Sequence, residues 1–248
     1  MTTSANASIA PNPQPGRVGK AIIRLFMKQA RVTEVEPVAE GFRLITLESP
    51  AFKGVAWTPG QKVQIAMGSA FVARTFTPIE WDAGAGRTRI LGYAHGDGPG
   101  SAWIRDSALG AECDVFGPRA SLDIPDAASI RVVLGDETSI GLAYALSRHF
   151  PRDTLHCLLE VNRAATAREV LEWMDLDAVD VFERAETEAH LADIERRLPA
   201  LAAAGATFVL TGNAASIQRQ GRALKALGVP RPRLLSKPYW APGRVGLD

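Results

Sequence analysis

Gly135-Asp136-Glu137-Thr138 follows a continuous apolar run at 130–134 and precedes a helical pattern at 140–150. An apolar strand that leads through a short loop into a helix is typical of a parallel α/β sheet. In open sheets of this kind, ligands lie beyond the carboxyl ends of the strands. The stretch therefore predicts a parallel sheet in the C-terminal half, with a binding site at the edge where this loop falls.

The rest of the C-terminal half repeats the same unit. Further strands are predicted at 155–161, 178–182, 207–210 and, as a last short strand, 233–235. Helical patterns lie between them, at 165–174, 189–204 and 214–227. Near-continuous apolar strands that alternate with amphipathic helices indicate a parallel sheet covered on both faces. We therefore expect a Rossmann-like domain at 126–248, including a C-terminal extension.

The N-terminal half follows a different pattern. Short runs rich in Val, Ile, Phe and Thr predict strands at 21–28, 31–38, 42–48, 61–68, 72–81, 88–95 and 112–117. One helix is predicted near 99–107. Regular short strands of this kind are typical of a small closed antiparallel barrel, which we place at 20–125. The fold class is thus a two-domain β plus α/β protein.

Composition excludes several classes of function. The chain has 248 residues and a formal net charge of +1, which gives no indication of a nucleic-acid partner. No apolar stretch approaches the roughly 20 residues of a membrane helix. Residues 1–19 are small and polar and lack the apolar core of a secretory signal, so we expect a disordered tail.

The cysteines and histidines predict no metal site, because no pair of them has the spacing of metal ligands. Cys113 and Cys157 each lie in an apolar strand-like run. Two buried thiols are therefore expected rather than a disulfide, which fits a reducing cytoplasm.

Arg74-Thr75-Phe76-Thr77 is the first candidate for a cofactor site. A flavin needs a cation and amides for its pyrophosphate, an apolar cover for its ring and a hydrogen-bond partner near the reactive nitrogen. Alternation along a strand puts Arg74 and Phe76 on one face, and a bend at Pro78 would let Thr77 reach the ring edge. The alternative is an ordinary strand with a surface Arg and a core Phe.

The segment from His95 to Trp103 is the second candidate. Its proline suits the first turn of a helix, and the amides of Gly100, Ser101 and Ala102 would then point at one spot. The positive end of the helix dipole makes such a spot an anion site. The alternative is a glycine turn before a helix.

The same segment also contains His95, Asp97 and Ser101, the residue types of a Ser-His-Asp hydrolase. Catalytic triads are assembled from distant segments, and the chain has no Gly-x-Ser-x-Gly elbow. We therefore disfavour a hydrolase.

Two further loops are expected at the edge of the parallel sheet. The loop at 211–216 follows the fourth strand, and Asn162-Arg163 follows the second. Basic residues at the latter position, with Arg168 one turn on, would favour the 2′-phosphate of NADPH. The alternative is that these arginines are solvated charges at the start of a helix. The standard Gly-x-Gly-x-x-Gly fingerprint is absent.

Taken in this order, the motifs resemble those of the siderophore-interacting protein family, a branch of the ferredoxin-reductase-like flavoproteins. The likeness covers about 20–245. Its motifs are the Arg-x-Tyr-(Ser/Thr), His-Gly, Gly-Pro-Arg, Gly-Asp-Glu-Thr and Tyr-Trp signatures, found here at 74–77, 95–103, 117–120, 135–138 and 239–243. Phe76 replaces the usual Tyr, and Ser139-Ile140-Gly141-Leu142 replaces the usual Ala-Leu-Pro-Ala.

The resemblance implies a barrel that binds FAD, a sheet that binds NAD(P)H, and reduction of ferric siderophores with release of ferrous iron. Reduced ferredoxin is an alternative electron donor. The implied cofactor-binding residues are Arg74, Phe76, Thr77, His95, Gly98, Gly100, Ser101, Trp103, Gly135, Asp136, Glu137, Thr138, Arg163, Gly212, Asn213 and Trp240. No catalytic nucleophile is expected.

Family members often carry a Lys in the strand after the Pro-Gly turn, which attracts acidic siderophores. The nearest position here is Gln64, and Lys62 lies on the same face of that strand. Arg148 lies near the position of an Arg expected in the first helix of the second domain. Two alternatives remain: a flavoprotein reductase for another acceptor, and a non-catalytic binding protein that has kept the fold.

Overall fold

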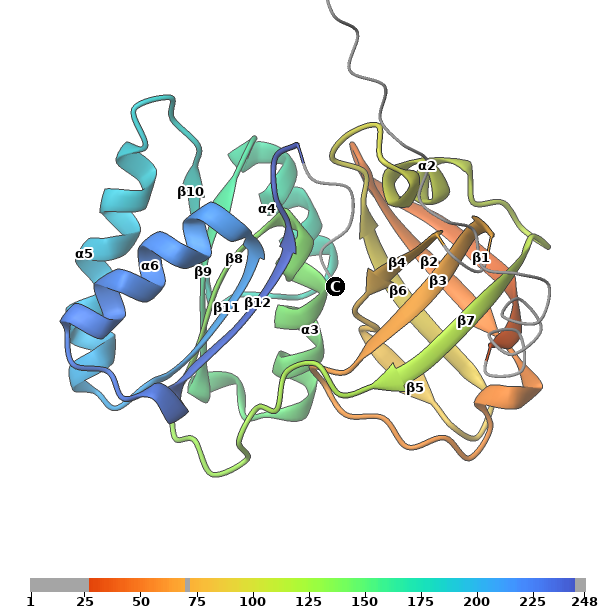
Figure 1. Ribbon diagram of the computed structural model, residues 1–248, viewed down its shortest axis with the longest axis horizontal. Coiled ribbons are helices and arrows are strands. Elements are labelled where there is room, and N and C mark those ends of the chain that lie inside the picture. The colour runs from red at the N-terminus through yellow and green to blue at the C-terminus, as the bar shows by residue number, and fades with distance from the viewer. Residues whose placement is uncertain (1–26, 70–71, 244–248) are drawn as a thin grey trace, which may run out of the picture.

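The computed structural model describes residues 27–69 and 72–243 and folds them into two domains that lie side by side (Figure 1). The predicted tail at 1–19, most of the predicted strand at 21–28 and the last residues of the predicted extension lie outside the described residues. An antiparallel sheet comes first along the chain, and a parallel sheet follows it.

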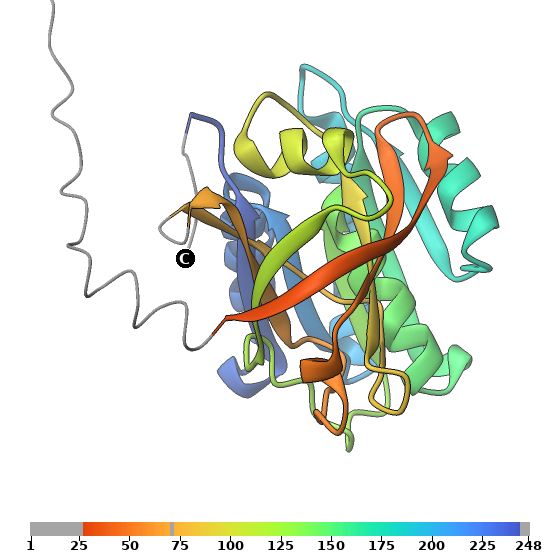
Figure 2. The same cartoon turned by 90° about the vertical axis from the view of Figure 1, so that its right-hand side faces the viewer.

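The N-terminal sheet has the strand order β4-β3-β7-β1-β2-β6-β5. The described strands are β1 (Lys28–Ala39), β2 (Phe42–Glu48), β3 (Lys62–Ser69), β4 (Val72–Phe76), β5 (Glu80–Asp82), β6 (Arg87–Tyr93) and β7 (Glu112–Arg119). Strands β4 and β5 stand at opposite edges, yet residues 77–79 join them, and such a link spans at most roughly 14 Å. The sheet therefore curls until its edges approach, and Figure 2 shows the resulting barrel in front of the second domain.

The predicted strand at 72–81 is divided in two. Strand β4 ends at Phe76 and β5 begins at Glu80, with Pro78 in the break. Proline has no amide hydrogen to give to a strand ladder, so the chain leaves the sheet at this point. The break turns Thr77 away from the barrel toward the second domain, where its side chain contacts Tyr239.

The C-terminal domain is the predicted Rossmann-like unit, with parallel strands in the order β10-β9-β8-β11-β12. The described strands are β8 (Arg131–Asp136), β9 (Leu155–Val161), β10 (Val179–Glu183), β11 (Thr207–Asn213) and β12 (Leu234–Trp240). The helices after them are α3 (Ile140–His149), α4 (Ala164–Trp173), α5 (Ala189–Ala203) and α6 (Ala214–Ala226). Strand β12 runs further than predicted and carries Tyr239 and Trp240 to the carboxyl edge of the sheet.

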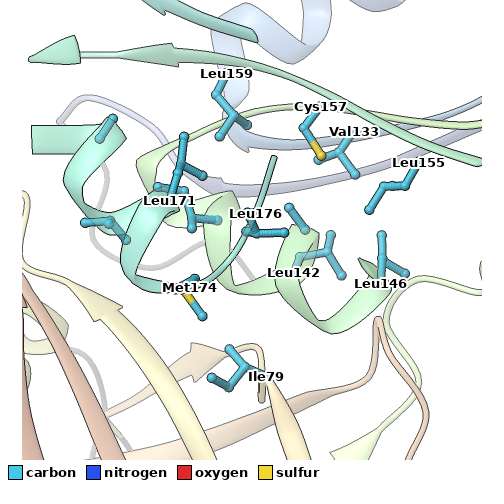
Figure 3. Close-up of a cluster of buried hydrophobic side chains, with 14 of the residues drawn as sticks. Ile79, Val133, Leu142, Leu146, Leu155, Cys157, Leu159, Leu171, Met174 and Leu176 are labelled. Carbon is cyan, nitrogen blue, oxygen red and sulfur yellow. The ribbon is translucent and has the colours of Figure 1, made fainter. Parts of the chain in front are cut away.

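Helices α3 and α4 cover the face of the parallel sheet that meets the barrel, whereas α5 and α6 cover the opposite face (Figure 1). One buried apolar cluster joins Ile79 of the barrel to Leu142 and Leu171 of these helices (Figure 3). A methyl group at Gly141 would lie 3.1 Å from Cγ2 of Ile79. Glycine at this position therefore lets the start of α3 approach the barrel closely.

The connector at 120–130 separates the last barrel strand from the first parallel strand, and the predicted boundary near 125 falls within it. Arg131 holds this connector in place. Its side chain is buried, donates hydrogen bonds to the carbonyl oxygens of Pro125 (2.8 Å) and Asp126 (2.7 Å), and lies 3.5 Å from the Phe150 ring centroid. An arginine that stacks on an aromatic ring while binding two carbonyls fixes the geometry of the link.

Both cysteines are free thiols, as predicted. Cys157 is buried and Cys113 is half-buried, and burial raises the pKa of each thiol to about 12. They are therefore protonated at neutral pH and poorly nucleophilic. In the described part of the chain, no helix has the length and apolarity to cross a membrane, and no group of acidic, His and Cys side chains is placed to hold a metal ion.

Replacing Arg131 with alanine is expected to lower the free energy of unfolding by about 2–4 kcal/mol, because the buried side chain loses its packing on Phe150 and its two hydrogen bonds to the connector. Urea denaturation measures this loss. Arg197→Ala, at an exposed position of α5, serves as the matched control and is expected to change stability by less than about 0.5 kcal/mol. Equal stability of the two variants would contradict the role assigned to Arg131.

Candidate functional site

A cleft opens between the two domains where β4, β6, the start of α3 and the end of β12 converge with the helix α2 (Pro99–Asp106). Its volume is about 760 Å³, including its open mouth. The lining residues are Arg74, Thr75, Phe76, Thr77, Leu91, Gly92, Tyr93, His95, Gly100, Ser101, Ile104, Thr138, Gly141, Tyr239 and Trp240. Residues distant in sequence thus form one concave surface.

Arg74 and the start of α2 lie against each other. A methyl group added at Gly100 would lie 3.4 Å from Cγ of Arg74, so the arginine stem packs on the glycine backbone. The guanidinium donates a hydrogen bond to the carbonyl oxygen of Ala73 (2.7 Å). The stem of the arginine that was predicted to bind an anion therefore lies against the predicted helix start.

The helix start offers two backbone amides rather than the predicted three. Gly98 is the N-cap, and Pro99 has no amide hydrogen. The amide of Ala102 already donates to the carbonyl oxygen of Gly98 (3.0 Å), so that part of the prediction is wrong. The amides of Gly100 and Ser101 have no helical partner, as in the first turn of any α-helix, and they can receive an anion. A methyl group at Gly98 would meet nothing within 4 Å, so the space before the helix is open.

Phe76 and Trp103 form an aromatic pair, with ring centroids 5.0 Å apart and planes tilted by 49°. Phe76 lines the cleft, whereas Trp103 does not. Trp103 therefore supports Phe76 from the side and does not present its own ring to the cleft.

The opposite wall contains aromatic residues that the motifs only partly predict. The Trp240 ring lies 5.1 Å from that of His95, and the His95 ring lies 5.9 Å from that of Tyr93. Tyr93 in turn stacks on Phe42 at 4.4 Å. A continuous run of aromatic rings thus crosses from the barrel to β12, a surface suited to a flat apolar group.

Thr77 donates a hydrogen bond to the Tyr239 hydroxyl across the domain boundary (3.2 Å). The sequence assigned Thr77 to a flavin and gave Tyr239 no role of its own. The Tyr-Trp motif could have identified Tyr239, because both residues lie at the end of β12. Two hydroxyl groups therefore meet at the wall of the cleft.

Asp136, predicted to contact a nucleotide, serves the architecture of the sheet. Its carboxylate is fully buried and accepts hydrogen bonds from the amides of Thr138 (2.9 Å) and Asn213 (2.8 Å) and from the indole Nε1 of Trp240 (2.8 Å). Gly212 has φ +95°, and a methyl group there would lie 2.3 Å from Asp136 Oδ2. The backbone of Gly212 thus makes room for the carboxylate, which joins the ends of three strands.

Gly135 is also required by packing. A methyl group there would lie 2.3 Å from Oγ of Ser139, which accepts a hydrogen bond from the Asp136 amide (3.3 Å). Of the predicted motif at 135–138, Thr138 lines the cleft, whereas the side chains of Asp136 and Glu137 are buried and do not line it.

Glu137 belongs to a buried group of charges around Arg184, which sequence reasoning missed. The Arg184 guanidinium lies 3.1 Å from Glu137, 3.7 Å from Asp136 and 3.8 Å from Glu160. Burial raises the pKa of Glu137, and the charge of Arg184 opposes that shift. His190 Nδ1 accepts from the Ala185 amide (3.1 Å), which leaves Nε2 to donate to Glu160 (3.2 Å).

Three predicted cations lie outside the cleft lining. Arg163 pairs with Glu40 of the barrel, so it links the domains. Arg148 lies in the last turn of α3, away from the cleft, and pairs with Asp175 at 3.6 Å. It therefore lies outside the cleft lining, away from the start of α3. Lys62 is the first residue of β3, and the next residue, Val63, pairs with Phe76 of β4. Lys62 therefore lies one residue along the strand from the position opposite Phe76.

The titration of Tyr239 predicts a pH-dependent loss of stability. Burial raises the pKa of its phenol to about 12, against about 10 in an unfolded chain. Below pH 10 both states keep the proton, so the contribution of Tyr239 is fully present. Between pH 10 and 12 the unfolded chain loses the proton first, and this contribution is lost.

Tyr239→Phe is therefore expected to be less stable than the parent by about 1 kcal/mol below pH 10. The difference should shrink as the pH rises toward 12, since phenylalanine does not titrate. Urea denaturation at several pH values measures it. A difference that stays constant across this range would contradict the burial of a protonated phenol.

No protein-family model matches the chain, and no curated protein matches it. Solved structures do. The siderophore-interacting protein SipS from Aeromonas hydrophila is 22% identical with a TM-score of 0.70, covering 88% of this chain and 92% of that one. A siderophore utilization protein from T. fusca is 23% identical with a TM-score of 0.71, covering 90% and 95%.

The ferredoxin reductase of carbazole 1,9a-dioxygenase is 17% identical, with a TM-score of 0.71, covering 86% of this chain and 69% of that one. At these sequence identities, the structural similarity establishes the fold alone. The chain therefore has the two-domain fold that siderophore-interacting proteins share with ferredoxin-reductase-like proteins.

Proposed function

We propose that the protein is a flavin-dependent oxidoreductase that binds FAD in the cleft between its domains. The observation that carries this proposal is the packing of Arg74 against the start of α2, where two amides have no helical partner. A cation beside free amides suits a pyrophosphate. One of the solved neighbours is described as the FAD apo form of a ferredoxin reductase, which is consistent with this assignment.

The residues of the cleft fit such a group. Phe76 and Trp240 offer aromatic faces to a flat ring from the two domains. The hydroxyls of Thr77 and Tyr239 offer hydrogen bonds at the ring edge. Bound FAD supplies the chemistry, accepting a hydride and passing on single electrons. The protein contributes binding, orientation and exclusion of water.

A reduced nicotinamide nucleotide is the proposed electron donor. Thr138 and Gly141 bring the carboxyl edge of the parallel sheet to the cleft, where ligands of such sheets lie. One neighbour is described as transferring electrons from pyridine nucleotides to a [2Fe–2S] centre. Reduced ferredoxin is the alternative donor.

The proposed acceptor is a ferric siderophore or another ferric chelate, which would release its iron after reduction. Support comes from a group of cations on adjacent strands. Lys62 of β3 is the register partner of Arg119 of β7, and Lys28 Nζ donates to the carbonyl oxygen of Gly117 (3.0 Å). Such charges attract acidic chelates. The free thiols suit a cytoplasmic location, where we place the reaction.

The position of Arg148 favours a second candidate, a reductase for a different acceptor. Pairing with Asp175 at the far end of α3 removes one of the two cations expected to attract a siderophore. Reduction of a ferric chelate in the presence of a ferrous-trapping dye separates the candidates.

The purified protein is expected to be yellow, or to become so when FAD is added, and to bleach on anaerobic addition of a reduced nicotinamide nucleotide. A visible spectrum records both changes. A protein that stays colourless with excess FAD would overturn the flavin assignment, and a yellow protein that no donor bleaches would be a binding protein.

Arg74→Ala is expected to weaken FAD binding at least about tenfold, because a charge-assisted contact to the pyrophosphate is lost. Flavin fluorescence during titration measures the affinity. Arg87→Ala, an exposed position of β6 paired with Asp82, is the matched control in the same domain. Equal FAD affinity of both variants would show that Arg74 does not hold the phosphate.

A further inference from the structure

A second cavity adjoins the cleft, and Tyr93 lines both. It lies where β9 ends and α4 begins, and its volume is about 630 Å³, including open space at its mouth. Its lining combines Glu40, Gly41, Phe42, Tyr93 and Ala94 of the barrel with Glu137, Asn162, Arg163, Thr166 and Ala167 of the second domain. A nucleotide with its nicotinamide in the cleft therefore has an adjacent cavity for its other end.

Carboxylates dominate the charge of this cavity. Glu40 and Glu137 outnumber Arg163 in its lining, and Arg163 already pairs with Glu40. Arg168, the second arginine of the predicted basic pair, does not line the cavity. Arg163, which the sequence predicted to favour a 2′-phosphate, is therefore already paired with a carboxylate of this chain.

The start of α4 is occupied by an acid as well. Arg163 is the N-cap residue but makes no side-chain cap, and the Ala164 amide donates instead to Oε2 of Glu183 (2.8 Å). A carboxylate thus stands where a helix would otherwise attract a phosphate.

Arg184 follows Glu183, and its charge is likewise paired with carboxylates of this chain. Its guanidinium faces Glu137, Asp136 and Glu160, all buried, and donates to the Asn162 side-chain oxygen (2.8 Å). The arginines at the ends of β9 and β10 thus both neutralise carboxylates of this chain.

We infer that this cavity takes the adenosine ribose of a nucleotide with a free 2′-hydroxyl, and that the electron donor is NADH rather than NADPH. The inference rests on the proposed function. A carboxylate accepts a hydrogen bond from a ribose hydroxyl, whereas a 2′-phosphate would bring nearly two negative charges against Glu40 and Glu137 of the lining. Glu183, behind the lining, already takes the Ala164 amide that could otherwise bind the phosphate. Like charges in such proximity oppose binding strongly.

The first test compares the two nucleotides on the FAD-loaded protein. Anaerobic bleaching is expected to be at least about tenfold more efficient with NADH than with NADPH, judged by kcat/KM. Calorimetry on the same protein is expected to show tighter binding of 5′-AMP than of adenosine 2′,5′-bisphosphate. Equal or reversed preferences in either measurement would overturn the inference while leaving the flavin assignment intact.

The second test removes the negative charges of Glu40 and Glu183 and keeps side chains of nearly the same size and shape. Glu183→Gln retains an oxygen for the Ala164 amide, and Glu40→Gln frees the Arg163 guanidinium. The double variant is expected to raise the efficiency of NADPH relative to NADH at least about tenfold. Glu169→Gln, at an exposed position of α4 outside the cavity lining, makes the charge change of one of these substitutions and is expected to leave the ratio unaltered.

Each remaining outcome is decisive. An unchanged ratio in the double variant would show that these carboxylates do not select the nucleotide. A protein that binds FAD but neither adenosine nucleotide would overturn the inference, and a protein that binds no FAD would overturn the proposed function itself.

Discussion

The buried carboxylate of Asp136 is the contact on which the cleft depends. It receives hydrogen bonds from the loop after β8, from the end of β11 and from the indole of β12. A buried charge is costly unless donors surround it, and here they do so from three strands. The same carboxylate that stabilises the sheet edge therefore also sets the position of Trp240, and with it one wall of the cleft.

The second wall is fixed by contacts between the domains. The apolar cluster around Ile79 and the close approach at Gly141 hold α3 on the barrel, while Thr77 reaches Tyr239 beyond the break at Pro78. Packing of this kind resists deformation, because an interior without voids has few alternative arrangements. The cleft is therefore preformed, which lowers the entropic cost of ordering a bound ligand.

The sequence predicted the two-domain fold and most of the strands and helices along the chain, because periodicity and local turn chemistry carry that information. The predicted proximity of Arg74 to the start of α2 agrees with the packing of its stem on Gly100. It did not predict the partners of the charges. Arg184, Glu160 and His190 meet only through the folded sheet, and no local spacing marks them. The same limit explains the misplaced role of Arg163, whose partner Glu40 lies in the other domain. An arginine that the local sequence predicts to be solvated forms an ion pair when an acid that is distant in the sequence lies beside it in the folded protein.

The order of the strands has a consequence for biosynthesis. Strand β12 forms an edge of the parallel sheet and pairs with β11 alone among the described strands, yet Tyr239 and Trp240 come from it. While the chain is still emerging from the ribosome, the barrel and most of the second domain can fold, but the cleft still lacks this side. A ligand that needs both faces can thus be retained only after translation has passed residue 240, so a partly made chain cannot sequester it.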